Sequence, residues 1–168
     1  MRFTFVPEYY FRTFDEASAE FLESIGVKGI VLDVDNTLEP YEHPIPGDHV
    51  ISWIESLRAR GINAAIVSNN GADRINLFNK DLCLPVYYKA KKPFKKNVLK
   101  AMRDMGTTKE NTIFMGDQVF TDVWAAHNTG IRAILVPPIN DKTDILTKIK
   151  RWLEKPVLKK YSKNQNKH

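Results

Sequence analysis

Two aspartates stand one residue apart at the end of an apolar run in the segment "VLDVDNTLEP". Burying the carboxylates of Asp33 and Asp35 beside Val31 and Leu32 costs free energy unless a cation or hydrogen-bond donors compensate them. Such carboxylates suit nucleophilic attack, proton transfer and the binding of oxygen-preferring cations. The segment therefore marks a candidate catalytic site.

Further polar residues follow other apolar runs in the same way. Ser68 ends the run in "INAAIVSNN", lysines 89–92 follow "PVYY", and Asp117 ends "NTIFMGD". A lone pair of aspartates is weak evidence, because a structural turn explains it equally well. Four polar elements at matching positions are difficult to reach by chance, so we interpret them as parts of one site.

The elements that position these residues alternate along the chain. Short apolar, β-branched runs predict strands, and apolar residues at helical spacing predict helices. Thr13 and Glu16 have the spacing of a capping box at the start of the predicted helix 13–26. Pro93 stands near the start of the predicted helix 91–106, and Gly106 stands at its end. The predicted strands are 28–34, 62–70, 85–89, 111–117 and 131–138, and the predicted helices are 13–26, 47–61, 72–80, 91–106, 121–130 and about 144–155, the last ending near Pro156.

Alternating strands and helices predict a parallel sheet with right-handed crossovers and helices on both faces. The expected fold class is therefore α/β, a three-layer, Rossmann-like fold with a sheet of about five strands. Ligands of such sheets bind beyond the carboxyl ends of the strands, which is where the polar residues fall. We expect one domain over residues 1–168, with a basic, flexible tail over 157–168.

Composition and charge limit the class of protein. The chain has 168 residues, a net charge of +5 and one cysteine, so no internal disulfide forms. No apolar run approaches the length of a membrane span or signal sequence, and we expect a cytoplasmic protein. Residues 142–168 hold nine Lys/Arg and two Asp/Glu, and residues 89–100 hold six lysines and no acid. These basic segments favour an anionic partner, or are simply solvated lysines.

Four motifs carry a family resemblance. "DVDNT", "SNN", "KKP" and "GDQVFTD", in this order and spacing, resemble the motifs of the haloacid dehalogenase-like (HAD) phosphatases. "LDVDNTLEPYE" and "MGDQVFTDV" are similar to the YqeG family of subclass IIIA, which is related to mitochondrial and plastid phosphatidylglycerophosphate phosphatases. The resemblance extends over most of the chain and has no departure at the catalytic positions.

The resemblance implies phosphomonoester hydrolysis through an aspartyl phosphate. Asp33 is implied as the nucleophile, and Asp35 as the acid that protonates the leaving alkoxide and then deprotonates water. The implied cofactor is Mg²⁺, held by Asp33, Asp117 and the main-chain carbonyl of Asp35. Its charge offsets the repulsion among the carboxylates and the incoming phosphate.

The remaining motif residues are implied to hold the phosphoryl group or to support the site. Ser68 and Lys92 are expected to bind phosphoryl oxygens. Asn69 either donates to phosphate or forms an Asn-Asn-Gly turn. Thr37 is expected to support the loop of the first motif, and Asp122 to orient either Lys92 or a metal-bound water.

Spacing between the motifs bears on the substrate. One helix and one strand fit between Asp35 and Ser68, and again between Ser68 and Lys92, which leaves no segment for a cap domain. An open site suits a large phosphorylated group, and the resemblance favours a lipid head group. The basic tail and the N-terminal aromatic residues are then candidates for peripheral contact with an anionic membrane at its inner face. The aromatic residues equally suit packing under the sheet. These aromatic residues are Phe3, Phe5, Tyr9, Tyr10 and Phe11.

Other functions remain open at this point. A nucleic-acid 3′-phosphatase would use the same motifs and would explain the lysines, but nucleic acid is the less favoured partner. A phosphoprotein is a further substrate that fits an open site. A non-catalytic adaptor in ribosome assembly would need no intact set of acids, so the full set argues against it.

Overall fold

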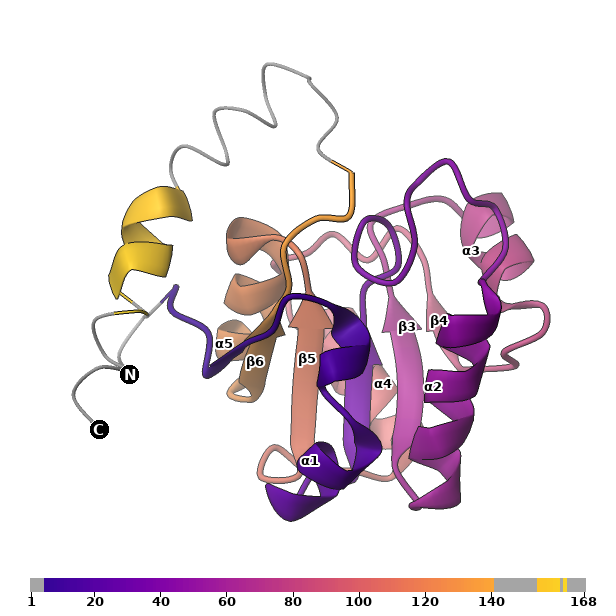
Figure 1. Cartoon of the computed structure of the whole chain (residues 1–168), viewed down its shortest axis with the longest axis horizontal. Helices are drawn as coiled ribbons and strands as arrows, with labels where there is room; N and C mark the ends of the chain where they lie inside the picture. Colours follow the sequence, from indigo (N-terminus) through magenta and orange to yellow (C-terminus); the bar gives the residue numbers. More distant parts are fainter. Residues whose placement is uncertain (1–4, 141–153, 161, 163–168) are drawn as a thin grey trace.

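A parallel sheet of six strands forms the centre of the protein. The computed structural model describes residues 5–140, 154–160 and 162. The strands lie in the order β1-β6-β5-β2-β3-β4, and every neighbouring pair is parallel. Their carboxyl ends therefore meet at one end of the sheet, toward which the arrowheads in Figure 1 point. The strands are β1 (Tyr9–Tyr10), β2 (Gly29–Leu32), β3 (Asn63–Val67), β4 (Val86–Tyr87), β5 (Thr112–Gly116) and β6 (Arg132–Leu135).

Helices cover both faces of this sheet (Figure 1). Along β2, Ile30 and Leu32 pack in one hydrophobic cluster and Val31 packs in a second, as the two-residue period of a strand requires. The predicted three-layer α/β architecture is thus confirmed, with one strand more than expected. The first cluster includes residues of α1 (Ala19–Ser24), α2 (Asp48–Ala59) and α3 (Ala72–Asn79), and the second residues of α4 (Lys96–Met105) and α5 (Trp124–Thr129).

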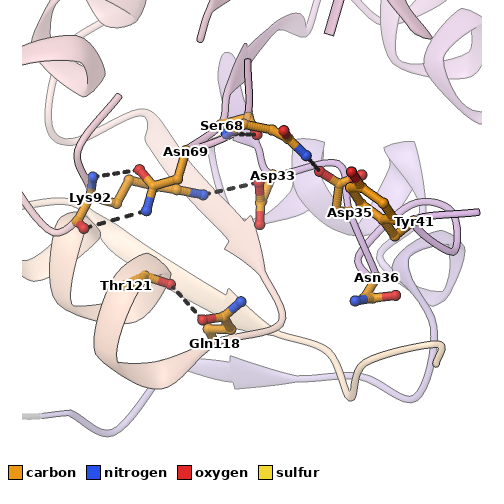
Figure 2. Close-up of a pocket in the computed structure, with 10 residues that line it drawn as sticks. Asp33, Asp35, Asn36, Tyr41, Ser68, Asn69, Lys92, Gln118 and Thr121 are labelled. Carbon is orange, nitrogen blue, oxygen red and sulfur yellow. Dashed lines mark hydrogen bonds and ion pairs between the residues drawn. The ribbon is translucent and has the colours of Figure 1, made fainter. Parts of the chain in front are cut away.

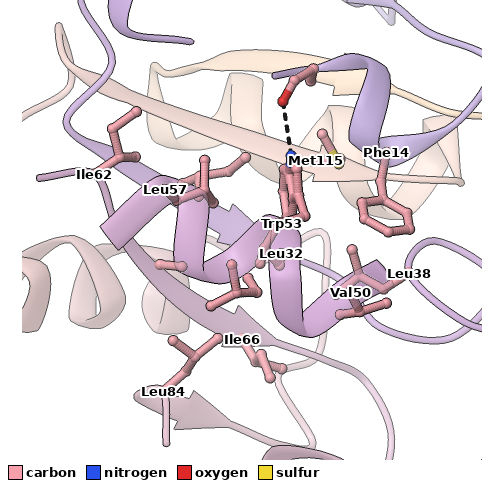
Figure 3. Close-up of a cluster of buried hydrophobic side chains, with 14 of the residues drawn as sticks. Phe14, Leu32, Leu38, Val50, Trp53, Leu57, Ile62, Ile66, Leu84 and Met115 are labelled. Atoms are coloured by element: carbon pink, nitrogen blue, oxygen red, sulfur yellow. Dashed lines mark hydrogen bonds between the residues drawn. The ribbon is translucent and has the colours of Figure 1, made fainter. Parts of the chain in front are cut away.

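Helix α2 illustrates how the first cluster forms. Val50, Trp53 and Leu57 recur at helical spacing and are buried under the helix (Figure 3). The Trp53 Nε1–H donates a hydrogen bond to the carbonyl oxygen of Ala17 at 3.0 Å, so its one polar group is satisfied inside the core. The predicted amphipathic helix is confirmed.

The N-terminal segment differs from the prediction. Instead of one helix over 13–26, a 3₁₀ turn η1 (Phe14–Glu16) precedes the short helix α1. Thr13 makes no capping hydrogen bond with its side chain, and the Ser18 hydroxyl caps α1 by accepting from the Phe21 N–H at 3.1 Å. The capping box of Thr13 and Glu16 was therefore wrong, because the helix begins one turn later, behind the better-placed serine.

Three of the N-terminal aromatic residues, Phe5, Tyr9 and Phe11, pack against the protein. Tyr9 and Phe11 each contact the ring of Phe21 edge-on, and Phe5 contacts Phe120 and Trp124 in the same way. β1 adds the sixth strand beside β6, which the sequence pattern did not indicate. Packing on the protein is thus the interpretation that holds for Phe5, Tyr9 and Phe11, whereas Tyr10 is 36% exposed and Phe3 lies outside the described residues.

The predicted start of the fourth helix was too early. Helix α4 begins at Lys96, and residues 88–95 form a loop that places the buried Lys92 beside the site. Gly106 ends the helix with φ of +68°, as expected for a left-handed glycine cap.

The C-terminal region is described only in part. Most of the predicted helix over 144–155 lies outside the described residues, but residues 154–160 are helical, so the prediction of an end near Pro156 was wrong. Val157 and Leu158 pack against the second hydrophobic cluster, which explains why the helix continues past the proline. Whether the rest of 157–168 forms a flexible tail stays a prediction. Within the described part of the chain, no helix is both long and apolar enough to cross a membrane.

Candidate active site

The predicted site residues gather at the carboxyl end of the sheet. Asp33 directly follows β2, Ser68 directly follows β3 and Asp117 directly follows β5, while Lys92 comes from the loop after β4. Asp33, Ser68 and Lys92 line a cavity of about 380 Å³ (Figure 2), and a carboxylate oxygen of Asp117 lies within 4.8 Å of one of Asp33. The residues that line the cavity are Asp33, Asp35, Asn36, Tyr41, Ser68, Asn69, Asn70, Lys92, Gln118 and Thr121.

Lys92 is the central cation of the site. Its ammonium lies 3.0 Å from Asp33 Oδ1 and 2.7 Å from Asp122 Oδ1, and its side chain is almost completely buried. Burial alone would lower the pKa of Lys92, but the carboxylates of Asp122 and Asp33 outweigh burial and raise that pKa above its ordinary value. Lys92 is therefore a fixed positive charge at the floor of the cavity.

Asp33 is held in an environment that penalises its charge. Burial raises the pKa of its carboxyl to about 7, the Asp122 carboxylate adds to the rise, and Lys92 opposes it. An additional cation beside Asp33 would favour the carboxylate form and bring the side chain to full charge near neutral pH.

Three buried carboxylates converge on one point. Oxygens of Asp33, Asp117 and Asp122 lie within 4.8 Å of one another, the spacing of ligands that share a metal ion. Together with the ammonium of Lys92, these side chains carry a formal charge of −2, so a divalent cation would make the group neutral. Oxygen donors suit a hard divalent cation. The residues present thus fit a metal site, with Asp122 as a third carboxylate beside the predicted Asp33 and Asp117.

Asp122 owes its position to a short π-helix, η2 (Val119–Val123), between β5 and α5. The Gln118 N–H donates to Asp122 Oδ2 at 3.0 Å, while Oδ1 accepts from Lys92. Of the two roles expected for Asp122, orienting Lys92 is the one that this contact supports.

Gly116 provides the space that Asp122 occupies. A Cβ at this position would overlap the Asp122 carboxylate, so we expect Gly116→Ala to displace it and to lower stability by about 1–3 kcal/mol. The stabilisation of the protein by a divalent cation should fall as well. Thermal unfolding with and without the cation measures both effects. Gly71→Ala is the matched control, because a Cβ there meets nothing within 4 Å, and an effect equal to that of Gly116→Ala would contradict the steric explanation.

Asp35 points away from the acidic cluster and has different partners. Asn70 Nδ2 donates to its Oδ2 at 2.8 Å, and Arg74 of α3 donates to Oδ1 from Nε at 3.1 Å and from Nη2 at 2.9 Å. Arg74 also donates to the carbonyl oxygen of Pro44 at 3.0 Å. These contacts fix the Asp35 side chain at the cavity wall. Ligation through its main-chain carbonyl stays a prediction.

The other predicted residues are also at the site. Thr37 Oγ1 donates to Asp117 Oδ1 at 3.3 Å, which joins the loop of the first motif to β5. Ser68 Oγ accepts from the Asn70 N–H at 3.1 Å and lines the cavity. The Asn69 side chain accepts from the Lys92 N–H at 2.7 Å and donates to the Lys92 carbonyl at 3.5 Å (Figure 2). Asn69 thus holds the Lys92 backbone, and its contact with phosphate stays a prediction.

Sequence reasoning missed several residues of the site. Asn70 and Arg74 hold Asp35, and Gln118 and Thr121 line the cavity. Asn70 belongs to the motif "SNN" and was available as a signal. Arg74 lies in a helix where an arginine is ordinarily a surface residue, so no pattern singled it out.

Comparison with known proteins gives the same picture. A family model described as haloacid dehalogenase-like hydrolase matches residues 12–136. The chain is 36% identical over 154 residues to a protein of Bacillus subtilis (strain 168) named Probable phosphatase YqeG, which covers 92% of this chain and 90% of the relative.

Solved structures share the fold at low identity. The cobalt-bound deoxy-D-mannose-octulosonate 8-phosphate phosphatase of Haemophilus influenzae aligns with a TM-score of 0.57 at 16% identity, covering 84% of this chain and 91% of that one. CbbY of Rhodobacter sphaeroides in complex with phosphate aligns with a TM-score of 0.58 at 12% identity, covering 70% and 89%. Because the family model matches most of its length and the Bacillus subtilis relative is 36% identical to it, the chain belongs to the haloacid dehalogenase-like hydrolases.

Proposed function

We propose that this protein is a Mg²⁺-dependent phosphomonoester hydrolase of subclass IIIA and that its substrate is phosphatidylglycerophosphate. The observation that carries the proposed chemistry is the buried group of three carboxylates and one ammonium at the floor of an open cavity. The name of the Bacillus subtilis relative, a probable phosphatase, supports the reaction type.

In the first half-reaction, a carboxylate oxygen of Asp33 attacks phosphorus and the bond to the leaving alkoxide breaks. Asp35 gives its proton to that alkoxide, and the phosphoryl group is left on Asp33. In the second half-reaction, Asp35 removes a proton from water, whose oxygen attacks phosphorus. Asp33 leaves as a carboxylate together with inorganic phosphate. Arg74 and Asn70 keep Asp35 at the cavity wall for both proton transfers.

The phosphoryl oxygens need positive charge and donors at the cavity floor. Lys92 supplies an ammonium that Asp122 holds in place, and Ser68 supplies a hydroxyl. Asp33, Asp117 and the main-chain carbonyl of Asp35 would hold Mg²⁺, with Asp122 as a further carboxylate beside them. The charge of the ion would stabilise the phosphoryl group and keep Asp33 ionised.

A lipid substrate agrees with the open shape of the site. The connections that follow the strands around the cavity are short, and the longest one described, residues 33–47, forms no separate domain. A head group presented at a bilayer would therefore reach Asp33 without the opening of a lid. We propose accordingly that the enzyme acts at the inner face of the membrane as a peripheral protein.

Purified protein should hydrolyse phosphatidylglycerophosphate in mixed micelles with Mg²⁺ and lose activity in EDTA, with recovery on adding Mg²⁺ back. Phosphate release would be measured beside that from a 3′-phosphorylated oligonucleotide, a phosphopeptide and a small phosphomonoester. The exposed Lys89 and Lys91, in the loop that carries Lys92, favour the oligonucleotide as the second candidate substrate. If the oligonucleotide is cleaved faster than the lipid, it replaces the lipid as the proposed substrate. A protein inactive on all four with Mg²⁺ would support the adaptor instead.

A further inference from the structure

The loop between β4 and α4 has two sets of side chains that face opposite ways. Lys92 is buried in the site, and Ala90 is buried beside it. On either side of them in the sequence, Tyr88 is 45% exposed and Phe94 is 70% exposed. Lys89 and Lys91 are exposed as well. One short loop therefore both completes the site and presents aromatic rings and ammonium groups to the outside.

Hydrogen bonds fix this arrangement from within. The Lys89 N–H donates to the Asn70 carbonyl at 2.8 Å, the Ala90 N–H to the Ser68 carbonyl at 2.9 Å, and Asn69 holds the Lys92 backbone. Lys89 and Lys91 both have positive φ, 46° and 55°, which is uncommon for residues other than glycine. The outward direction of the exposed side chains is thus built into a well-bonded loop.

Two more loops at the carboxyl end of the sheet carry exposed apolar side chains. Ile45 is 55% exposed in the loop after β2, which also supplies Tyr41 to the cavity wall. Ile139 is 47% exposed after β6, and its N–H donates at 3.0 Å to the carbonyl of Asn36, another cavity residue. We define the rim surface as Ile45, Tyr88, Lys89, Lys91, Phe94 and Ile139.

The chemistry of the rim surface distinguishes between partners. Protein interfaces concentrate apolar residues at a core from which lysine is depleted, whereas here Lys89 and Lys91 stand between two exposed rings, those of Tyr88 and Phe94. A mixture of this kind suits a bilayer, where rings and aliphatic groups enter the acyl boundary and ammonium groups meet lipid phosphates. The loop after β2 also carries Glu42, which accepts from Asn140 at 3.5 Å, so the basic character comes from the loop after β4.

We propose that the rim surface docks on an anionic lipid bilayer. Phe94 and Ile45 enter the interface, Lys89 and Lys91 contact lipid phosphates, and the cavity then opens toward the head groups. This inference rests on the proposed function and adds to it a defined membrane face. It also replaces Phe5, Tyr9 and Phe11 as the membrane contact, because their partly buried rings pack on other aromatic rings of the protein.

The test is sedimentation with vesicles of phosphatidylcholine alone or mixed with phosphatidylglycerol, without substrate. At low salt, Lys89→Gln with Lys91→Gln should lower the partition coefficient on mixed vesicles by about 10- to 30-fold, since each lysine near an anionic surface contributes on the order of 1 kcal/mol. Phe94→Ser should lower it by about tenfold at low and at high salt, because it removes apolar burial. Hydrolysis of a water-soluble phosphomonoester should not change in these variants.

The matched control is Lys28→Gln with Lys109→Gln, the same loss of charge at the opposite end of the sheet, where both lysines are exposed. It should bind vesicles like the unmodified protein, and an equal loss would mean that net charge alone drives binding. Rim variants that bind normally, while phosphatidylglycerophosphate in detergent is hydrolysed, overturn docking and leave the function standing. If the unmodified protein does not hydrolyse phosphatidylglycerophosphate but the rim variants lose vesicle binding, docking stands and the proposed substrate is wrong. A dimer that Phe94→Ser dissociates, with no effect on vesicles, would assign the surface to a second copy.

Discussion

Asp33→Asn should lower turnover of phosphatidylglycerophosphate by about 10³-fold or more, as the loss of an enzymatic nucleophile does. The amide is nearly isosteric with the carboxylate, but it is a poor nucleophile and a weaker metal ligand. Single-turnover experiments with ³²P-labelled substrate provide the sharper measurement. The unmodified protein should carry label on Asp33 after a rapid acid quench, and the variant should carry none. A near-normal rate in a pure preparation would exclude the covalent mechanism.

Stability separates the chemical effect of this substitution from misfolding. The folded-state pKa of Asp33 is raised to about 7, mainly by burial, whereas the ordinary value is 3.8. In EDTA, the stability associated with the protonated carboxyl is therefore present below pH 3.8 and is lost as pH rises through about 7. The Asp33→Asn variant has no such proton, so its melting temperature should fall less between pH 5 and pH 8. A variant that melts far below the unmodified protein at pH 5 would show that the fold is damaged.

Lys92→Met should affect both activity and stability. It leaves the buried carboxylates of Asp33 and Asp122 without their shared cation, and breaking a buried ion pair in this way costs about 3–5 kcal/mol. Losing the ammonium beside the phosphoryl group should lower kcat by about 10²- to 10³-fold. Methionine has an unbranched apolar side chain that fills most of the space of the lysine stem without its charge, so the loss reports charge more than volume. Denaturant unfolding in EDTA and steady-state kinetics with Mg²⁺ measure the two effects.

Lys91→Met is the control for this substitution. Lys91 is exposed, one position away in the same loop, and its replacement should change stability by no more than about 0.5 kcal/mol. If Lys92→Met is as stable as Lys91→Met, the ion pairs with Asp33 and Asp122 contribute little to the folded state. If both variants keep full activity on a soluble substrate, Lys92 is not part of the phosphate site.

The central part of the site was predictable because it follows from a rule of chain geometry. Parallel strands end at one end of the sheet, so residues placed directly after apolar runs must meet there. Asp33, Ser68 and Asp117 meet that condition, and the structure places them accordingly. The carboxylate cluster adds Asp122, for which the sequence left open two roles without direct metal contact.

Other parts depend on contacts that no local pattern encodes. Arg74 reaches Asp35 across 39 positions of the chain, and only the packing of α3 beside the cavity makes them neighbours. Strand β1 has two residues, which is too short for an alternating pattern, and it forms because β6 offers an unpaired side. Ser18 caps α1 instead of Thr13 because tertiary packing decides where a short helix begins. The local sequence therefore limits which helix starts, strands and site residues are possible, and long-range contacts decide which of them form.

The pairing of β1 with β6 has a consequence for the order in which the protein folds during translation. Tyr9 pairs with Ile134, which the ribosome adds 125 positions later. At about 5–20 residues per second, the first strand waits for roughly 6–25 seconds before its partner exists. Until then, the side chains of Tyr9 and Phe11 have no completed sheet to pack on, which makes this segment a candidate for chaperone binding on nascent chains. Closure of the sheet at β1 therefore cannot precede the synthesis of β6.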